Sequence, residues 1–158
     1  MNGHSLPRIL ALAALLAASG TASAGTYRVD DSASTVLSSR VDLKWDPLLS
    51  RRGQHADAIG HLTVISRLDV SRWAGKQGRI YMLLPSQPSV PVLTSWTTRG
   101  QMLPGTLRDG GRTLVFSGMV PASGKIEDTL ELTIQADVRR LTGPEQLTYT
   151  FEIDVDTP

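Results

Sequence analysis

The stretch QLTYTFEIDVDTP, residues 146–158, alternates apolar and polar side chains along its length. Its apolar members are Leu147, Tyr149, Phe151, Ile153 and Val155. Successive side chains of a β-strand point to opposite faces of a sheet, so this pattern predicts a strand with one buried face. Such a strand needs a hydrogen-bonded neighbour along each unprotected edge. Residues 129–138, TLELTIQADV, alternate in the same way and are expected to form one neighbour, with residues 139–145 as the turn.

The first 24 residues have the pattern of a secretory signal peptide. A basic residue, Arg8, precedes an apolar run over residues 9–18, and Ala22-Ser23-Ala24 has the small-x-small pattern of a cleavage site. The run is shorter than the roughly 20 residues that span a bilayer. We therefore expect cleavage after Ala24 and a single domain over residues 25–158, exported through the periplasm.

Charge and cysteine content limit the kinds of partner. The chain has 16 basic and 15 acidic residues, and Arg8 lies in the expected signal peptide, so the mature charge is near zero. The basic pairs at 51–52 and 139–140 are not flanked by aromatic side chains, and no nucleic-acid partner is expected. The chain has no cysteine. Its fold must be held by packing, or with help from a partner.

Most of the remaining sequence predicts strands and turns. Residues 34–45 place Leu37, Val41 and Leu43 on one face of a strand, and residues 59–70 place Leu62, Val64, Ser66 and Leu68 on one face of another. Residues 78–84, GRIYMLL, are nearly all apolar, which predicts a strand buried on both faces. The sequence Asp109-Gly110-Gly111 predicts a tight turn. Seven or eight such strands are typical of an antiparallel sandwich or barrel.

A search for catalytic or metal-binding chemistry gives no favoured candidate. His55, Asp57 and His61 have the right ligand types at short spacing, but Arg51 and Arg52 would repel a cation and no further ligand completes the set. No nucleophile motif of a serine hydrolase is present. We therefore expect no cofactor, no metal and no enzyme activity, and keep a secreted enzyme only as a third class of function.

Trp73 is a candidate for surface recognition. It lies beside Arg72 and Gly75 in residues 68–78, whose glycines favour a turn over a helix. Loop tryptophans with basic neighbours can anchor a binding partner. Partial burial is the alternative for this side chain, and both interpretations stay open.

Three segments together resemble the subunits of bacterial chaperone–usher fimbriae. They are GRIYMLLPSQPSVPVLTSWTTRGQMLPG, RTLVFSG and the closing LELTIQADVRRLTGPEQLTYTFEIDV. The pattern is similar to the Afa/Saf-type invasin or tip subunits. Those subunits carry a cysteine pair that this chain does not have, so cysteine-free pilins of the CS1/alpha type are the other branch that it resembles.

The resemblance implies an immunoglobulin-like antiparallel β-sandwich that is incomplete and is completed by a donor strand. A periplasmic chaperone, and then another fimbrial subunit, would add that strand at the edge of the last strand, with an outer-membrane usher and a host receptor as further partners. Leu147, Tyr149, Phe151, Ile153 and Val155 would line one side of the groove, and Leu37, Val41 and Leu43 the other side. Residues 25–35, GTYRVDDSAST, would be the chain's own donor segment, although they contain few apolar residues.

A carrier of apolar ligands is the alternative. Residues 26–41, TYRVDDSASTVLSSRV, are similar to the opening of YceI-like proteins, which are β-barrels that hold a lipid. This interpretation predicts a closed barrel with a ligand inside, whereas the fimbrial interpretation predicts an open edge.

Overall fold

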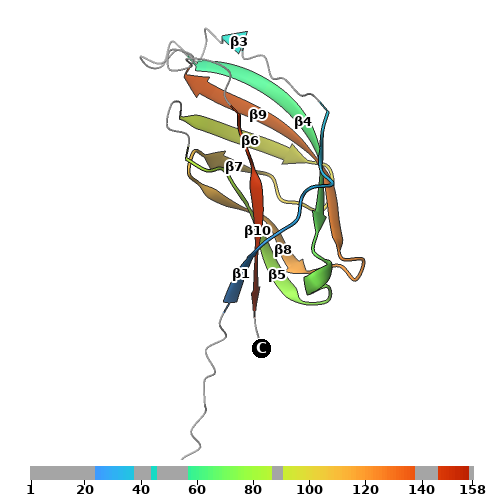
Figure 1. Cartoon of the computed structure of the whole chain (residues 1–158). Helices are drawn as coiled ribbons and strands as arrows, with labels where there is room; N and C mark the ends of the chain where they lie inside the picture. The colour runs from blue at the N-terminus through green and yellow to red at the C-terminus, as the bar shows by residue number, and fades with distance from the viewer. Residues whose placement is uncertain (1–23, 38–43, 46–56, 87–90, 138–145, 157–158) are drawn as a thin grey trace, which may run out of the picture.

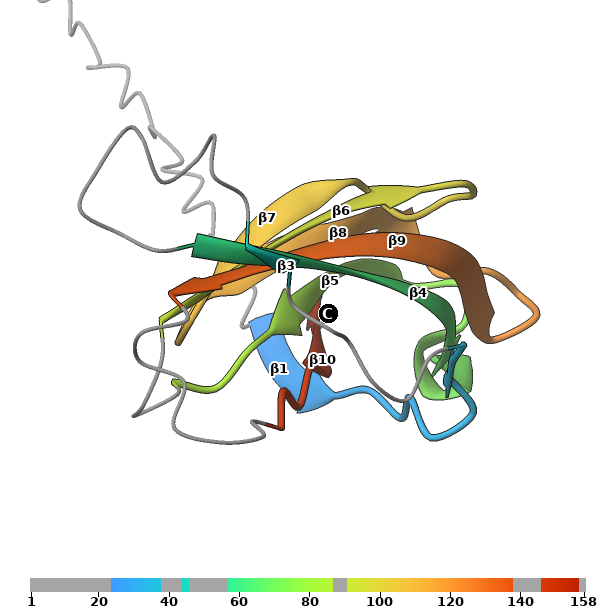
Figure 2. The ribbon, with the colours of Figure 1, turned by 90° about the horizontal axis from the view of Figure 1, so that it is seen from above.

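The computed structural model describes residues 24–37, 44–45, 57–86, 91–137 and 146–156. These residues form an all-β structure of two antiparallel sheets, which lie one over the other as two layers (Figures 1 and 2). In the described part of the chain, no helix has the length and apolar character needed to cross a membrane. The all-β class and the two antiparallel sheets predicted from the sequence are therefore confirmed.

The first sheet contains the last strand of the chain. Its strands are, in spatial order, β1 (Ala24–Arg28), β10 (Thr150–Asp156), β5 (Gln77–Leu83) and β8 (Arg112–Met119). Strand β10 therefore lies between β5 and the N-terminal strand β1, and both pairings are antiparallel.

The second sheet contains the two longest strands. Its spatial order is β2 (Thr35–Val36), β4 (Asp57–Asp69), β9 (Lys125–Asp137), β6 (Val92–Thr98) and β7 (Gly105–Arg108), with β3 (Lys44–Trp45) also paired to β4. Strands β4 and β9 pair over their full length, from Asp57↔Asp137 to Asp69↔Lys125. Strands β9 and β10 bury alternate apolar residues between the two sheets.

The position of β9 corrects one sequence prediction. Residues 129–138 were expected to pair with the last strand, but β9 lies in the second sheet between β4 and β6, and β10 pairs with β5 in the first. Alternation identifies the buried face of a strand and does not say in which sheet the strand lies. Here Leu130 and Leu132 of β9 and Phe151 and Ile153 of β10 belong to the same buried core from opposite sheets.

Strand β5 corrects a second prediction. It was expected to be buried on both faces, but only its inward residues, such as Ile80 and Met82, are fully buried. The outward residues Arg79 and Tyr81 are exposed and half-buried. The guanidinium carbon of Arg112 lies 3.5 Å from the centre of the Tyr81 ring, so a charged side chain covers this aromatic residue instead of a second apolar layer.

The predicted turns are present. The amide of Gly111 donates to the carbonyl of Arg108 (2.8 Å), which closes the turn between β7 and β8, and Gly110 has a φ of +70° that favours glycine. Residues 71–73 form the short 3-10 helix η1 (Ser71–Trp73) before Gly75, rather than a longer helix.

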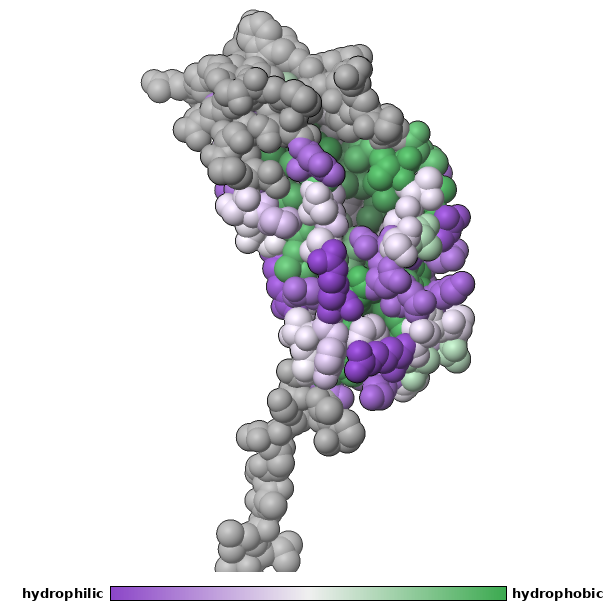
Figure 3. Space-filling view, in the orientation of Figure 1, coloured by the Kyte–Doolittle hydropathy of each residue, from purple (hydrophilic) through white to green (hydrophobic). Residues whose placement is uncertain are grey.

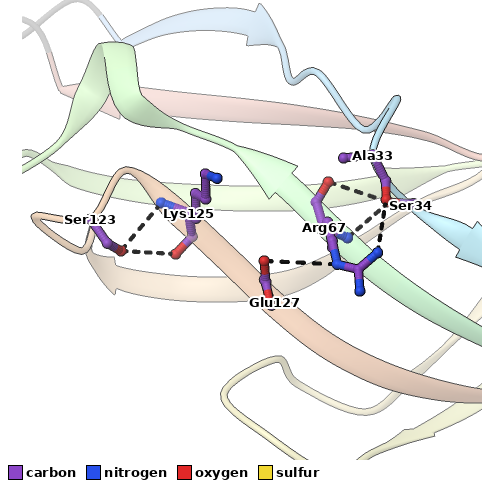
Figure 4. A network of polar contacts seen from close by, with 6 residues as sticks. All are labelled: Ala33, Ser34, Arg67, Ser123, Lys125 and Glu127. Atoms are coloured by element: carbon purple, nitrogen blue, oxygen red, sulfur yellow. Dashed lines mark hydrogen bonds and ion pairs between the residues drawn. The ribbon is translucent and has the colours of Figure 1, made fainter.

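The chain crosses from the first sheet to the second directly after β1. The amide of Asp69 donates to the carbonyl of Asp30 (2.9 Å), and the amide of Arg67 donates to the Ser34 hydroxyl (2.8 Å). The Arg67 guanidinium also donates to the carbonyl of Ala33 and forms an ion pair with Glu127 (Figure 4). These contacts fix the crossing segment against β4, so β1 belongs to one sheet and β2 to the other.

Candidate functional site: the edge of strand β10

Strand β10 has the predicted buried face, but it begins at Thr150, so Leu147 and Tyr149 precede it. Phe151, Ile153 and Val155 are buried in the core, whereas Glu152 and Asp154 lie on the outer face of the first sheet. One edge of β10 pairs with β5 from Thr150 to Val155. The other edge is the candidate site, because its occupant comes from the opposite end of the sequence.

Strand β1 occupies that edge. It pairs with β10 from Ala24↔Asp156 to Arg28↔Glu152, and the amide of Val29 extends the pairing by donating to the carbonyl of Phe151 (2.9 Å). Val29 is only 1% exposed and belongs to the core, whereas Tyr27 and Arg28 are exposed. The buried Val29 side chain and the short backbone pairing therefore help to hold this N-terminal strand.

The inward face of β1 rests on η1. The ring of Tyr27 lies 5.7 Å from the ring of Trp73, and the Arg72 guanidinium lies over both rings. Trp73 itself is 7% exposed and is part of the core. Of the two interpretations of Trp73, burial is the one observed. Its described aromatic contact is with the chain's own N-terminal strand.

The outer face of the edge carries a polar cluster. The Thr26 hydroxyl donates to Oδ1 of Asp154 (2.6 Å), and the Arg112 guanidinium donates to the same oxygen (2.8 Å). Arg112 also lies 3.6 Å from Glu152. Burial by itself would raise the pKa of Asp154, but the hydrogen bonds from Thr26 and Arg112 and the nearby arginine charges outweigh it and lower the pKa.

Partly buried apolar residues lie on both sheets of the sandwich. We define the open seam by five residues that lie along β2 and β4 in one sheet and before β10 in the other: Val36, Leu62, Val64, Leu147 and Tyr149. Val36 is 51% exposed although it pairs with the core-facing Val64. The other four are half-buried against the core. Figure 3 shows apolar surface at the upper right, where β4 bends, with a hollow between it and β10.

One hydrogen bond crosses the sandwich next to the seam. The hydroxyls of Tyr149 and Thr94 lie 2.6 Å apart, and Thr94 is fully buried in β6. Burial raises the pKa of Tyr149, and its hydrogen bond with Thr94 partly opposes this increase. Tyr149 therefore ties the start of β10 to the opposite sheet.

The structure brings together only part of the predicted groove. Phe151, Ile153 and Val155 border the edge, and Leu147 and Tyr149 border the open seam. Leu37 lies at the edge of the other sheet, where its amide donates to the carbonyl of Thr63 (3.0 Å) and its side chain is 60% exposed. It is therefore next to β4 rather than β10. Val41 and Leu43 lie outside the described residues.

The metal-ligand candidates are also separated. His55 lies outside the described residues, and His61 is exposed on the outer face of β4, where Nδ1 is 3.2 Å from the Thr133 hydroxyl. Among the residues that the structure describes, no group of three or more histidine, cysteine or acidic side chains could hold a metal ion. A depression of about 360 Å³ lies beside His61, with hydroxyl side chains such as Thr63 and Ser95 at its wall.

The polar cluster at the β10 edge was not predicted from the sequence. Thr26, Asp154 and Arg112 come from three strands, and their positions in sequence give no sign that they meet. The alternation of Thr26 and Arg28 with Tyr27 and Val29 is the one local signal for β1, and it is short.

Comparison of the chain with protein-family models, curated proteins and solved structures found no match.

Proposed function

We propose that the protein is a structural or adhesive subunit of a bacterial surface fimbria, assembled by the chaperone–usher pathway through strand addition at β10. In this proposal the sandwich is of the immunoglobulin-like type. The observation that carries it is the occupant of the β10 edge, the short N-terminal strand β1, which is followed by one deeply buried side chain, Val29. A strand at a chain end can be replaced by the same strand of another molecule without altering the rest of the fold.

The open seam supports the same proposal. An edge that receives an added strand needs backbone groups for pairing and apolar pockets for alternate side chains. The half-buried Leu62, Val64 and Leu147 pack against the core and leave part of their apolar surface uncovered by it. A longer donor strand, from a periplasmic chaperone or from another subunit, would cover this surface, and the usher would export the assembled subunits to the cell surface.

The lipid-carrier alternative has less support. It calls for a closed barrel with an enclosed apolar cavity, whereas the described strands form two separate sheets. An apolar ligand extracted from the purified protein in stoichiometric amount would favour this alternative.

Cysteine cross-linking tests strand addition directly. Because Val29 and Phe151 form a hydrogen-bonded pair, Arg28 and Glu152 form the adjacent non-hydrogen-bonded pair, with Cα atoms about 4.5 Å apart. This distance suits a disulfide, and the chain has no cysteine of its own to interfere. The variants Arg28→Cys and Glu152→Cys, made on separate copies, can therefore form a disulfide only when β1 of one copy pairs with β10 of the other.

The experiment is best done in the bacterium that makes the protein. We expect disulfide-linked dimers from co-expressed R28C and E152C copies in surface material. The control pair R28C and S117C should give none, since Ser117 lies on β8, two strands beyond β10. If R28C/E152C on a single copy forms only intramolecular disulfides in surface material, and separate copies form no dimers, assembly by this strand is excluded.

A further inference from the structure

The Asp154 carboxylate at the β10 edge is oriented by residues that do not belong to β1. Arg112 of β8 reaches across β5 to Asp154 on β10, and its guanidinium carbon lies 3.5 Å from the centre of the Tyr81 ring. The same guanidinium lies 3.6 Å from Glu152. These contacts do not involve β1. The carboxylate of Asp154 therefore keeps its orientation whichever strand pairs with β10.

The Asp154 carboxylate is poorly accessible to water. Its side chain is 16% exposed, and Oδ1 receives both Thr26 (2.6 Å) and Arg112 (2.8 Å). A strand without a hydroxyl at this position would remove the Thr26 bond and leave Arg112 as the described donor to Oδ1. Loss of a hydrogen bond to a charged, half-covered group costs more than loss of one between exposed neutral groups. Asp154 therefore distinguishes between strands that present the same apolar face.

We infer that Asp154 selects the register and the sequence of the strand that adds to β10, by requiring a hydroxyl side chain opposite it. The second requirement is an aliphatic residue three positions later, where Val29 fills the core. A complementary strand then has the pattern Ser/Thr-x-x-aliphatic, which β1 meets with Thr26 and Val29. This inference rests on the proposed function, and it names the chemistry of the segment that a partner subunit or chaperone would offer.

The Thr26–Asp154 contact also bears on the register of β1 against β10. A slip of β1 by two residues keeps its apolar side chains inward, because the side-chain period of a strand is two. In one such slip Thr26 lies opposite Glu152 instead of Asp154, and position 28 lies opposite Thr150 instead of Glu152. The inward residues Gly25 and Tyr27 distinguish these registers weakly because they bury little surface, whereas Val29 would leave its core position in the slip. The Thr26 hydroxyl is the group that changes partner.

The first experiment measures register within one full-length chain. Under a glutathione redox buffer, the R28C/E152C variant reports the observed register and the R28C/T150C variant reports the slipped one. We expect the equilibrium constant for disulfide formation to be at least about tenfold larger for R28C/E152C than for R28C/T150C. This ratio should fall by about tenfold when Asp154→Ala or Thr26→Val is added. Thr26→Ser should retain the preference. The control Asp156→Asn should also retain it, because it removes only an exposed ion pair with Arg79 on the same face.

An unchanged preference in the Asp154→Ala and Thr26→Val variants would overturn the inference. The second experiment uses two copies: an R28C donor that keeps Thr26 competes with an R28C donor that also carries Thr26→Val for an E152C acceptor. We expect about tenfold more disulfide from the donor that keeps the hydroxyl. Equal yields would refute selection by Asp154 and leave strand addition standing. Absence of disulfide with either donor would refute strand addition itself, whatever the first experiment shows.

Discussion

The detachment of β1 from β10 can be measured through Val29. The substitution Val29→Ala removes two buried carbon atoms at about 0.8 kcal/mol each, and the cavity left behind brings the loss to about 2 kcal/mol. Val29 is 1% exposed, so we expect nearly the full loss of stability. A loss of about 2 kcal/mol corresponds to an increase of about 30-fold in the equilibrium constant for opening.

Native-state hydrogen exchange is the assay. The amide at position 29 donates to Phe151 and is freed when β1 detaches, so we expect its exchange to be about 30-fold faster in Val29→Ala. The matched control is Val115→Ala, an equally buried valine in β8 that remains covered when β1 leaves. It should accelerate exchange in the β4–β9 ladder and leave the amide at position 29 unchanged.

The control decides the interpretation. If Val115→Ala accelerates exchange at position 29 as much as in the β4–β9 ladder, β1 opens only when the whole domain unfolds. Strand β1 would then be an integral part of the sandwich, and the reasoning that treats it as exchangeable would be refuted.

Three further predictions concern the polar groups of the sandwich. Tyr149→Phe should lower the free energy of unfolding by about 1–3 kcal/mol, because it leaves the buried Thr94 hydroxyl unpaired, whereas adding Thr94→Val should recover much of the loss in urea titrations. Asp154 has a lowered pKa in the folded protein, so its contribution to stability is present above the ordinary aspartate pKa of about 3.9 and is lost as the pH falls through the folded value. Asp154→Asn should therefore reduce the fall in melting temperature with decreasing pH in that acid range, and an unchanged pH profile would contradict the assignment. Asp128→Ala should lower the free energy of unfolding by at least about 3 kcal/mol in the same urea titrations. The reason is that this buried carboxylate accepts the backbone amides of Arg99, Gly100, Met102 and Thr129. A decrease below about 1 kcal/mol would mean that these amides find other acceptors.

Burial in the candidate site follows closely from the sequence. The alternation in residues 146–158 predicts a buried face of five apolar residues. Phe151, Ile153 and Val155 are in the core, whereas Leu147 and Tyr149 precede the strand and are partly buried against it. The reason is local, because the two-residue period of a strand and the hydrophobic effect together fix which side chains turn inward. Trp73 shows the limit of this argument: its sequence context left burial and recognition both open, and the position of Tyr27 above it belongs to the tertiary structure.

Only the tertiary structure decides what lies beside the last strand. By itself, the sequence determines an all-β chain with a closing strand that is apolar on one face. It does not determine that β5 and β1 flank that strand. Backbone N–H and C=O groups are nearly the same for every residue type, so they do not specify which strand pairs with which. The pairing of Thr26 with Asp154 joins residues from opposite ends of the chain, and neither is unusual in its own segment. The two meet because both sheets must cover one core, and the strand that completes the first sheet is drawn from the N-terminus.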